Sequence, residues 1–336
     1  MTARRVVAFG GGHGLSASLR ALRHCAPELD LDITAVVTVG DDGGSSGRLR
    51  AERGGLPPGD LRQALVALAG DHPATRRSAG LFQHRFAAVP TGGVPEESDP
   101  QRAAARADGL AGHAVGNLVL CGLMELLGDP VAALEHAGAM LGTVGRVLPM
   151  SRQPVGIEAR VRGVDPAAPD EVRTVRGQHQ VAVTTGRVES LRLTPAAPAA
   201  CAEALAAIGA ADWLIFGPGS WYTSVLPHLL VPQLADAIVS SAARRLVTLN
   251  LAAEKETLGL SVADHLAALR WYLPELKVDF VLADAKAVGD PEPVERAAES
   301  LGARLVLAPV AVTDGTPRHD PAALGAALVP VLGADR

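Results

Sequence analysis

The chain has 336 residues, 48% of them hydrophobic, which allows either two domains or one large α/β unit with a sizeable core. Its formal net charge of −5, from 31 basic and 36 acidic residues, gives no reason to expect nucleic acid or an anionic membrane surface as a partner. No run approaches the roughly 18 apolar residues of a membrane span, and no signal core follows the N-terminus, so we expect a cytoplasmic protein.

Apolar strand-like runs alternate with helical patterns along most of the chain. The predicted strands are residues 6–9, 33–39, 213–216, 245–250, 278–283 and 304–308. The predicted helices are residues 15–24, 57–69, 118–127, 131–141 and 262–272. This alternation predicts an α/β fold with a doubly wound, mainly parallel sheet in three α/β/α layers, and we favour a single domain over residues 1–330.

Two segments depart from this pattern. Residues 87–109 are rich in Pro, Gly, Ala and charge without an apolar period, which predicts a surface loop or a disordered insertion. Residues 155–194 contain short alternating runs, which predict a small antiparallel β subdomain or an added edge on the main sheet. The apolar positions of these runs are Val155, Ile157, Ala159, Val161, Val181, Val183, Val188, Leu191 and Leu193.

The first glycine-rich turn, Gly10-Gly11-Gly12-His13-Gly14, follows the strand at 6–9. Missing side chains let backbone N–H groups approach an anion closely, and the helix that follows aims its positive end at the same point. The spacing does not meet the strict dinucleotide fingerprint, and the Lys-Ser/Thr ending of a P-loop is missing. The turn is therefore either a ligand loop or an ordinary tight turn.

A second turn, from Asp41 to Arg48, follows the strand at 33–39 and brings two carboxylates next to small residues and a guanidinium. Its candidate ligand-binding residues are Asp41, Asp42, Gly43, Gly44, Ser45, Ser46 and Arg48. An aspartate here either binds a ribose hydroxyl, a base edge or a divalent cation, or merely caps the turn. Magnesium is the cation that these carboxylates and Asp60 would suit, whereas Cys25, Cys121 and Cys201 are too far apart in sequence for zinc.

A third turn, Gly217-Pro218-Gly219-Ser220, follows the strand at 213–216. Ligands collect outside the carboxyl ends of parallel strands, so we expect all three turns to face one crevice. Ser220 and Thr223 are candidates to bind a diphosphate, with simple helix capping as the alternative. There is no G-x-S-x-G elbow, so a serine nucleophile is not expected and no catalytic residue is assigned.

Polar residues outside the three turns complete the set of candidates. Asn117 lies in an apolar helix and needs a partner, either a ligand or a neighbouring turn. His113 is either a ligand contact or a structural hydrogen-bonding group at the start of that helix. Arg62 either neutralises phosphate or is a solvated helix charge.

Five sequence blocks, in order along the chain, carry a family resemblance. They are Gly10 to Ser16, Val37 to Arg50, Pro57 to Arg62, Gly112-His113 with Gly116-Asn117-Leu118, and Gly217 to Ser220 with Tyr222-Thr223-Ser224. Together they resemble the gluconeogenesis factor (YvcK) family, which lies in the superfamily of 2-phospho-L-lactate transferase (CofD). The resemblance covers residues 5–315, nearly the whole chain.

The resemblance implies a Rossmann-like fold that binds a UDP-sugar such as UDP-N-acetylglucosamine. It further implies a regulator of cell shape and wall growth on gluconeogenic carbon sources, acting through a protein partner that it does not identify. It implies ligand contacts from the glycine-rich turns and from Asn250: Gly11, Gly12, His13, Gly14, Gly217 and Gly219 join the candidates above. A homodimer is the default assembly.

Two other functions stay open. CofD transferases move a phospholactyl group from a guanosine diphosphate carrier with the help of a divalent metal, although their second block usually lacks the Ser-Ser-Gly-Arg-Leu-Arg run found here. The third possibility is a scaffold with a vestigial crevice. Its support is the segment 250–257, which is one residue shorter than is usual in the family and lacks a glycine. His13 and His228 also replace the family's usual Thr and Asn.

Overall fold

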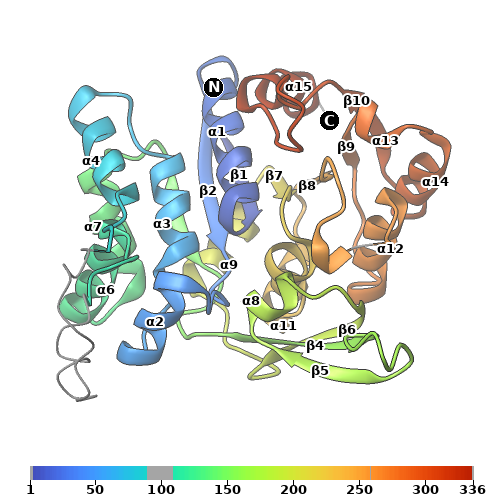
Figure 1. The fold of residues 1–336 in the computed structure, drawn as a ribbon. Coiled ribbons are helices and arrows are strands. Elements are labelled where there is room, and N and C mark those ends of the chain that lie inside the picture. Colours follow the sequence, from blue (N-terminus) through green and yellow to red (C-terminus); the bar gives the residue numbers. More distant parts are fainter. Residues whose placement is uncertain (1–2, 89–108, 258, 335–336) are drawn as a thin grey trace.

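The computed structural model describes residues 3–88, 109–257 and 259–334, and a seven-stranded sheet forms its centre (Figure 1). The strands stand in the order β10-β9-β8-β7-β1-β2-β3, and every neighbouring pair is parallel. Their bounds are β1 Arg4–Gly10, β2 Leu31–Val37, β3 Arg146–Pro149, β7 Trp213–Phe216, β8 Arg244–Thr248, β9 Phe280–Asp284 and β10 Arg304–Ala308. The predicted doubly wound parallel sheet is confirmed.

The order of the strands reverses between β1 and β7. From β1 the chain proceeds outward through β2 and β3, and from β7 it proceeds the other way through β8, β9 and β10. Such a topological switch point opens a crevice at the carboxyl ends of the two central strands. The first glycine-rich turn follows β1 and the third follows β7, so the topology brings them together.

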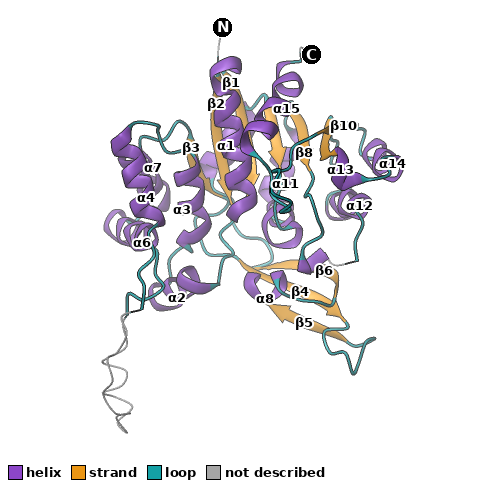
Figure 2. Ribbon diagram, turned by 45° about the horizontal axis from the view of Figure 1, so that its top comes forward, coloured by secondary structure: helices purple, strands orange, loops and turns teal. Residues whose placement is uncertain are grey.

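Helices cover both faces of this sheet (Figure 1). α1 Gly12–Leu29 packs against α3 Pro58–Ala67 and α15 Pro321–Gly333, while α9 Ala202–Ala210 packs against α11 Pro232–Ser240, and α12 Val262–Tyr272 against α14 Glu292–Ser300. Beyond β3 lie α4 Pro73–Gln83, α6 Val115–Leu127 and α7 Pro130–Leu141 (Figure 2). No helix in these described ranges combines the length and the hydrophobicity that a bilayer crossing requires.

The central strands are apolar because both of their faces are covered. All four residues of β7 and all five of β9 are buried. Phe9 of β1 and Phe216 of β7 stack with their ring centroids 4.8 Å apart, directly beneath the two turns. Fully buried parallel strands favour such unbroken apolar runs, which is why the sequence revealed them.

A separate three-stranded antiparallel sheet lies at the carboxyl edge of the large sheet (Figure 2). It consists of β4 Gly156–Arg162, β5 Val172–Arg176 and β6 Arg187–Thr194, in the order β5-β4-β6. The predicted β-like run at Val181 and Val183 is wrong, because these residues lie in and just after the short helix α8 Gln178–Ala182. Val181 is buried there, and the backbone N–H of His179 donates to Asp42 at 2.8 Å, so tertiary contacts stabilise the helix.

Other local features were not predicted. The second glycine-rich turn contains the start of a helix, α2 Gly44–Arg53, which ends at Gly54 in the left-handed conformation. Strands β3 and β5 were also missed, as were helices α4, α9, α11, α14 and α15, although α4, α11 and α14 are amphipathic. Most of the loop predicted at 87–109 lies outside the described residues.

The first and third turns touch through their backbones. A Cβ atom placed on Gly14 would lie 2.3 Å from the carbonyl oxygen of Pro218 and 2.4 Å from the Cα of Gly219. Both neighbours are backbone atoms, which cannot move aside as a flexible side chain can. Any other residue at position 14 must therefore push the two turns apart.

Gly14→Ala tests this contact. We expect a loss of about 1–3 kcal/mol in the free energy of unfolding, because overpacking shifts backbone rather than side chains. Gly122→Ala is the matched control, since Gly122 lies in the middle of α6 with nothing within 4 Å of its Cβ position. There we expect a gain of about 0.5–1 kcal/mol from helix propensity. Denaturant unfolding measures both, and equal effects would contradict the close contact.

Candidate functional site

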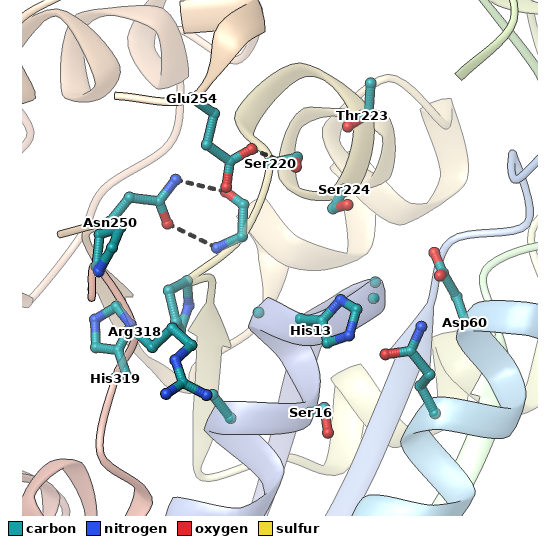
Figure 3. A pocket seen from close by; sticks show the side chains of 18 of the residues that line it. His13, Ser16, Asp60, Ser220, Thr223, Ser224, Asn250, Glu254, Arg318 and His319 are labelled. Atoms are coloured by element: carbon teal, nitrogen blue, oxygen red, sulfur yellow. Dashed lines mark hydrogen bonds between the residues drawn. The ribbon is translucent and has the colours of Figure 1, made fainter. Parts of the chain in front are cut away.

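A central cavity of about 830 Å³ opens at the switch point (Figure 3). Its wall is built from the first turn, the third turn, the segment after β8 and the segment before α15, together with parts of α3, the end of α4 with Arg85, and α8. Eight of the expected ligand residues line it: Gly11, Gly12, His13, Gly14, Gly219, Ser220, Thr223 and Asn250. The first and third turns therefore share one site.

The first turn lies directly over a buried carboxyl group. A Cβ on Gly11 would lie 2.4 Å from Oδ2 of Asp60 and 2.5 Å from Oγ1 of Thr38. The Thr38 hydroxyl donates to that same Asp60 oxygen at 3.1 Å. Burial, reinforced by the nearby charge of Asp41, raises the pKa of Asp60 to about 7. Asp60 thus holds a proton until near neutral pH at the floor of the cavity.

The third turn is held in place by the segment after β8. Nδ2 of Asn250 donates to the carbonyl of Gly219 at 2.9 Å, and the N–H of Gly219 donates back to Oδ1 at 2.8 Å. The Ser220 hydroxyl donates to the carboxylate of Glu254 (Figure 3). Farther in, the N–H of Tyr222 donates to Glu256. The side chain of Asn250 therefore holds the backbone of Gly219 through two hydrogen bonds.

Charge in the cavity is predominantly basic. Four arginines line it, Arg20, Arg62, Arg85 and Arg318. They face two carboxyl groups, Asp60 and Glu254. Because Asp60 is largely protonated below pH 7, the cavity favours an anion, and guanidinium groups match phosphate oxygens in geometry.

The second glycine-rich turn faces a neighbouring hollow of about 680 Å³ instead of the central cavity. Asp42, Gly44, Ser45 and Arg48 line this hollow, and Arg85 lines both spaces. Among the remaining candidates, Asp41, Gly43, Ser46, Asn117 and Gly217 line neither of them. The crevice expected for three turns is thus divided into two adjoining spaces.

A buried chain of side chains runs between the two spaces. Nε of Arg62 donates to Oδ1 of Asn117 at 2.8 Å, and Nδ2 of Asn117 donates to Oγ of Ser45 at 2.9 Å. Ser45 in turn lies 2.9 Å from Nδ1 of His113. Burial, aided by the charge of Arg48, lowers the pKa of His113, so this imidazole is neutral at physiological pH.

Asp41 lies near enough to the buried carboxyl group of Asp60 for its charge to raise the pKa of Asp60. A Cβ on Gly59 would lie 2.6 Å from Oδ2 of Asp41. In contrast, Oδ1 of Asp42 accepts from His179, at the start of α8. Within the described residues, no three His, Cys, Asp or Glu side chains are grouped as a metal site. A magnesium ion here would need water or ligand oxygens to complete its shell.

Comparison with known proteins gives the family. The model of the family "2-phospho-L-lactate transferase CofD" matches residues 6–307. The chain belongs to the CofD family. A Mycobacterium tuberculosis protein named "Putative gluconeogenesis factor" is 48% identical over 334 residues, which are 98% of this chain and 91% of that protein. The "Gluconeogenesis factor" of Bacillus subtilis is 34% identical over 303 residues, 90% of this chain and 84% of that protein.

The fold agrees with a solved structure from this group. A crystal structure from Bacillus halodurans, described as a protein member of the UPF0052 family, superposes with a TM-score of 0.79 at 32% identity. The match covers 98% of this chain and 99% of that one. This CofD-family chain therefore has the fold of that structure, and its relatives named gluconeogenesis factor confirm the sequence resemblance.

Several cavity residues escaped the sequence analysis. Arg20, Arg85, Arg318 and Glu254 lie on four separate segments and carry no local motif. Arg20 had a signal, because it lies two helical turns after the first glycine-rich turn on the face of Ser16. The other three reach the cavity through long-range folding alone.

The buried carboxyl group predicts a pH dependence. Asp60 has its pKa raised from 3.8 to about 7 in the folded chain, so between these values the unfolded chain loses the proton first and stability falls as pH rises. Asp60→Asn removes this loss and keeps an acceptor for Thr38. We expect the variant to gain several degrees of Tm over the wild type at about pH 8 and little at about pH 4. Equal Tm differences across that range would contradict a buried, protonated Asp60.

Proposed function

We propose that the chain binds a UDP-sugar, such as UDP-N-acetylglucosamine, in the central cavity and acts as a cytoplasmic regulator of cell shape and wall growth on gluconeogenic carbon sources. The observation that carries this proposal is the cavity shared by two glycine-rich turns at the switch point and lined by four arginines. Its volume of about 830 Å³ lies in the range of small-molecule sites.

The diphosphate fits at the start of α1. This helix is 18 residues long, its N-cap residue is Gly11, and no side chain caps it. The free backbone N–H groups and the positive end of the helix dipole favour an anion there. Gly219 and Ser220 of the third turn line the same cavity as the start of α1, so a diphosphate there can contact both turns.

A regulator needs a response to its ligand. A UDP-sugar that contacts the first turn, the third turn and the segment 250–257 together stabilises one arrangement of these segments over others. That difference in affinity can then alter binding of a protein partner. The names of the M. tuberculosis and B. subtilis relatives support a role in gluconeogenic growth.

A panel of ligands tests the proposal by thermal shift. UDP-N-acetylglucosamine and UDP-glucose are expected to raise Tm, because a ligand that binds only the native state adds about 2.7 kcal/mol at a hundredfold excess over Kd. N-acetylglucosamine without a nucleotide serves as the control and should give no shift. If uridine compounds leave Tm unchanged while another nucleotide raises it, the proposed ligand class is wrong.

A second candidate function is transfer of a phospholactyl-type group from a guanosine diphosphate carrier. The CofD family match and the electrostatic coupling between Asp41 and Asp60 favour it. A bound magnesium ion would supply charge neutralisation on the diphosphate. The chain itself would contribute the carboxylates that hold the ion and the arginines that orient the donor.

Magnesium dependence separates the two candidates. For a transferase we expect magnesium to increase the thermal shift given by GDP, and Asp41→Asn to abolish that increase because one of two ligands is lost. Asp236→Asn, on the exposed side of α11, is the control and should retain the increase. If GDP with magnesium gives neither a shift nor turnover of a GDP-linked donor, the transferase candidate fails.

A further inference from the structure

We propose that the guanidinium of Arg62 binds the anionic part of the ligand in the central cavity, and that Asn117, Ser45 and His113 are positioning residues that orient it. This inference rests on the proposed function, since it names the charge that holds the diphosphate. It also assigns a role to the second glycine-rich turn, whose Ser45 lies outside the central cavity.

Two of the three guanidinium nitrogens of Arg62 donate hydrogen bonds to neighbouring side chains, and within the described part of the chain the third does not. Its Nε donates to Asn117 at 2.8 Å, and its Nη1 donates to the side-chain oxygen of Gln83. Within residues 3–88, 109–257 and 259–334, Nη2 has no hydrogen-bond acceptor, although Arg62 is only 5% exposed and lines the cavity. A guanidinium with an unused N–H edge in a cavity calls for an anionic acceptor.

The stem of Arg62 is packed as tightly as its head. A Cβ on Gly116 would lie 2.9 Å from Cδ of Arg62 and 2.7 Å from the ring of Phe82. The first turn of α6 therefore presses on the arginine stem, and little rotamer freedom remains. Binding an anion then costs little side-chain entropy, which favours affinity.

The two hydrogen bonds that lead from Arg62 to Ser45 have one possible direction. Arg62 is a donor only, so the oxygen of Asn117 must face it and the Asn117 NH₂ must face Ser45. Ser45 accepts from Asn117, and its hydroxyl lies 2.9 Å from Nδ1 of His113, to which it can donate when that nitrogen carries no proton. Every link in the chain is satisfied when Arg62 donates at its inner end.

The charge of Arg62 is available to a ligand. Burial and the nearby Arg85 lower its pKa, while Asp60 and Asp41 act in the opposite sense. Since Asp60 holds its proton until near pH 7, it does not neutralise Arg62 fully. The planar guanidinium can meet two phosphate oxygens at once, which an ammonium group cannot.

Binding of three probes to variants tests the inference. Calorimetry would compare inorganic pyrophosphate, UDP and uridine on Arg62→Lys, Asn117→Ala and Ser45→Ala. We expect Arg62→Lys to lower the affinity for pyrophosphate and for UDP about tenfold or more, because lysine keeps the charge but loses the paired N–H donors of the planar guanidinium. The affinity for uridine, which has no phosphate, should stay within about twofold of the wild type. Asn117→Ala and Ser45→Ala should lower the affinity for pyrophosphate and UDP by smaller factors.

Controls distinguish positioning from a merely structural role. Arg23→Lys is the matched control, because Arg23 is also partly buried and bonded to Ala67 and Asp71 but lies outside the cavity lining. It should leave all three affinities unchanged. A purely structural effect of Asn117→Ala would lower Tm without changing the affinity ratio of UDP to uridine. In the double variant with Arg62→Lys, Asn117→Ala should add little, because both act through one guanidinium.

The outcomes separate this inference from the proposed function. If UDP binds the wild type and Arg62→Lys equally well, the inference is wrong and the proposed function stands. If pyrophosphate binding depends on Arg62 but no uridine compound binds better than pyrophosphate, the inference stands and the UDP-sugar proposal fails. If neither pyrophosphate nor UDP binds the wild type, both fail.

Discussion

The contact between two backbone turns at the switch point is the constraint on which the rest of the site depends. Gly14 and Gly219 meet where β1 and β7 end, with no room for a Cβ between them. Because these strands are neighbours in the sheet and the helices after them lie on opposite faces, their turns splay apart above this contact. Both turns line the cavity.

The net charge of the cavity depends on the burial of its ionisable groups as well as on their hydrogen-bond partners. Asp60 lies beneath the first turn with the Asp41 charge nearby, and desolvation keeps it protonated to about pH 7. Arg62 is buried too, but its donors are shared among Asn117, Gln83 and the cavity. A protonated acid and an incompletely used guanidinium together leave net positive character, which suits a diphosphate.

Several side chains that the sequence predicts as ligand contacts form hydrogen bonds within the protein instead. Asn250 uses both ends of its amide on the backbone of Gly219, and Asp42 accepts from His179 of the small sheet's helix. Asn117, expected to meet a ligand or a turn, meets Ser45 of the second turn. These residues act on the cavity by fixing what surrounds it.

The sequence by itself determined the strands of the large sheet except β3, the glycine-rich turns that follow three of them, the presence of a small antiparallel sheet and the family. These are local signals: unbroken apolar runs mark strands covered on both faces, and glycine marks close backbone approach. The tertiary structure alone decided that the second turn opens a helix beside a separate hollow, and that Arg20, Arg62, Arg85 and Arg318 converge. Their convergence depends on the order of the strands and on contacts across hundreds of residues, and no short-range periodicity encodes either.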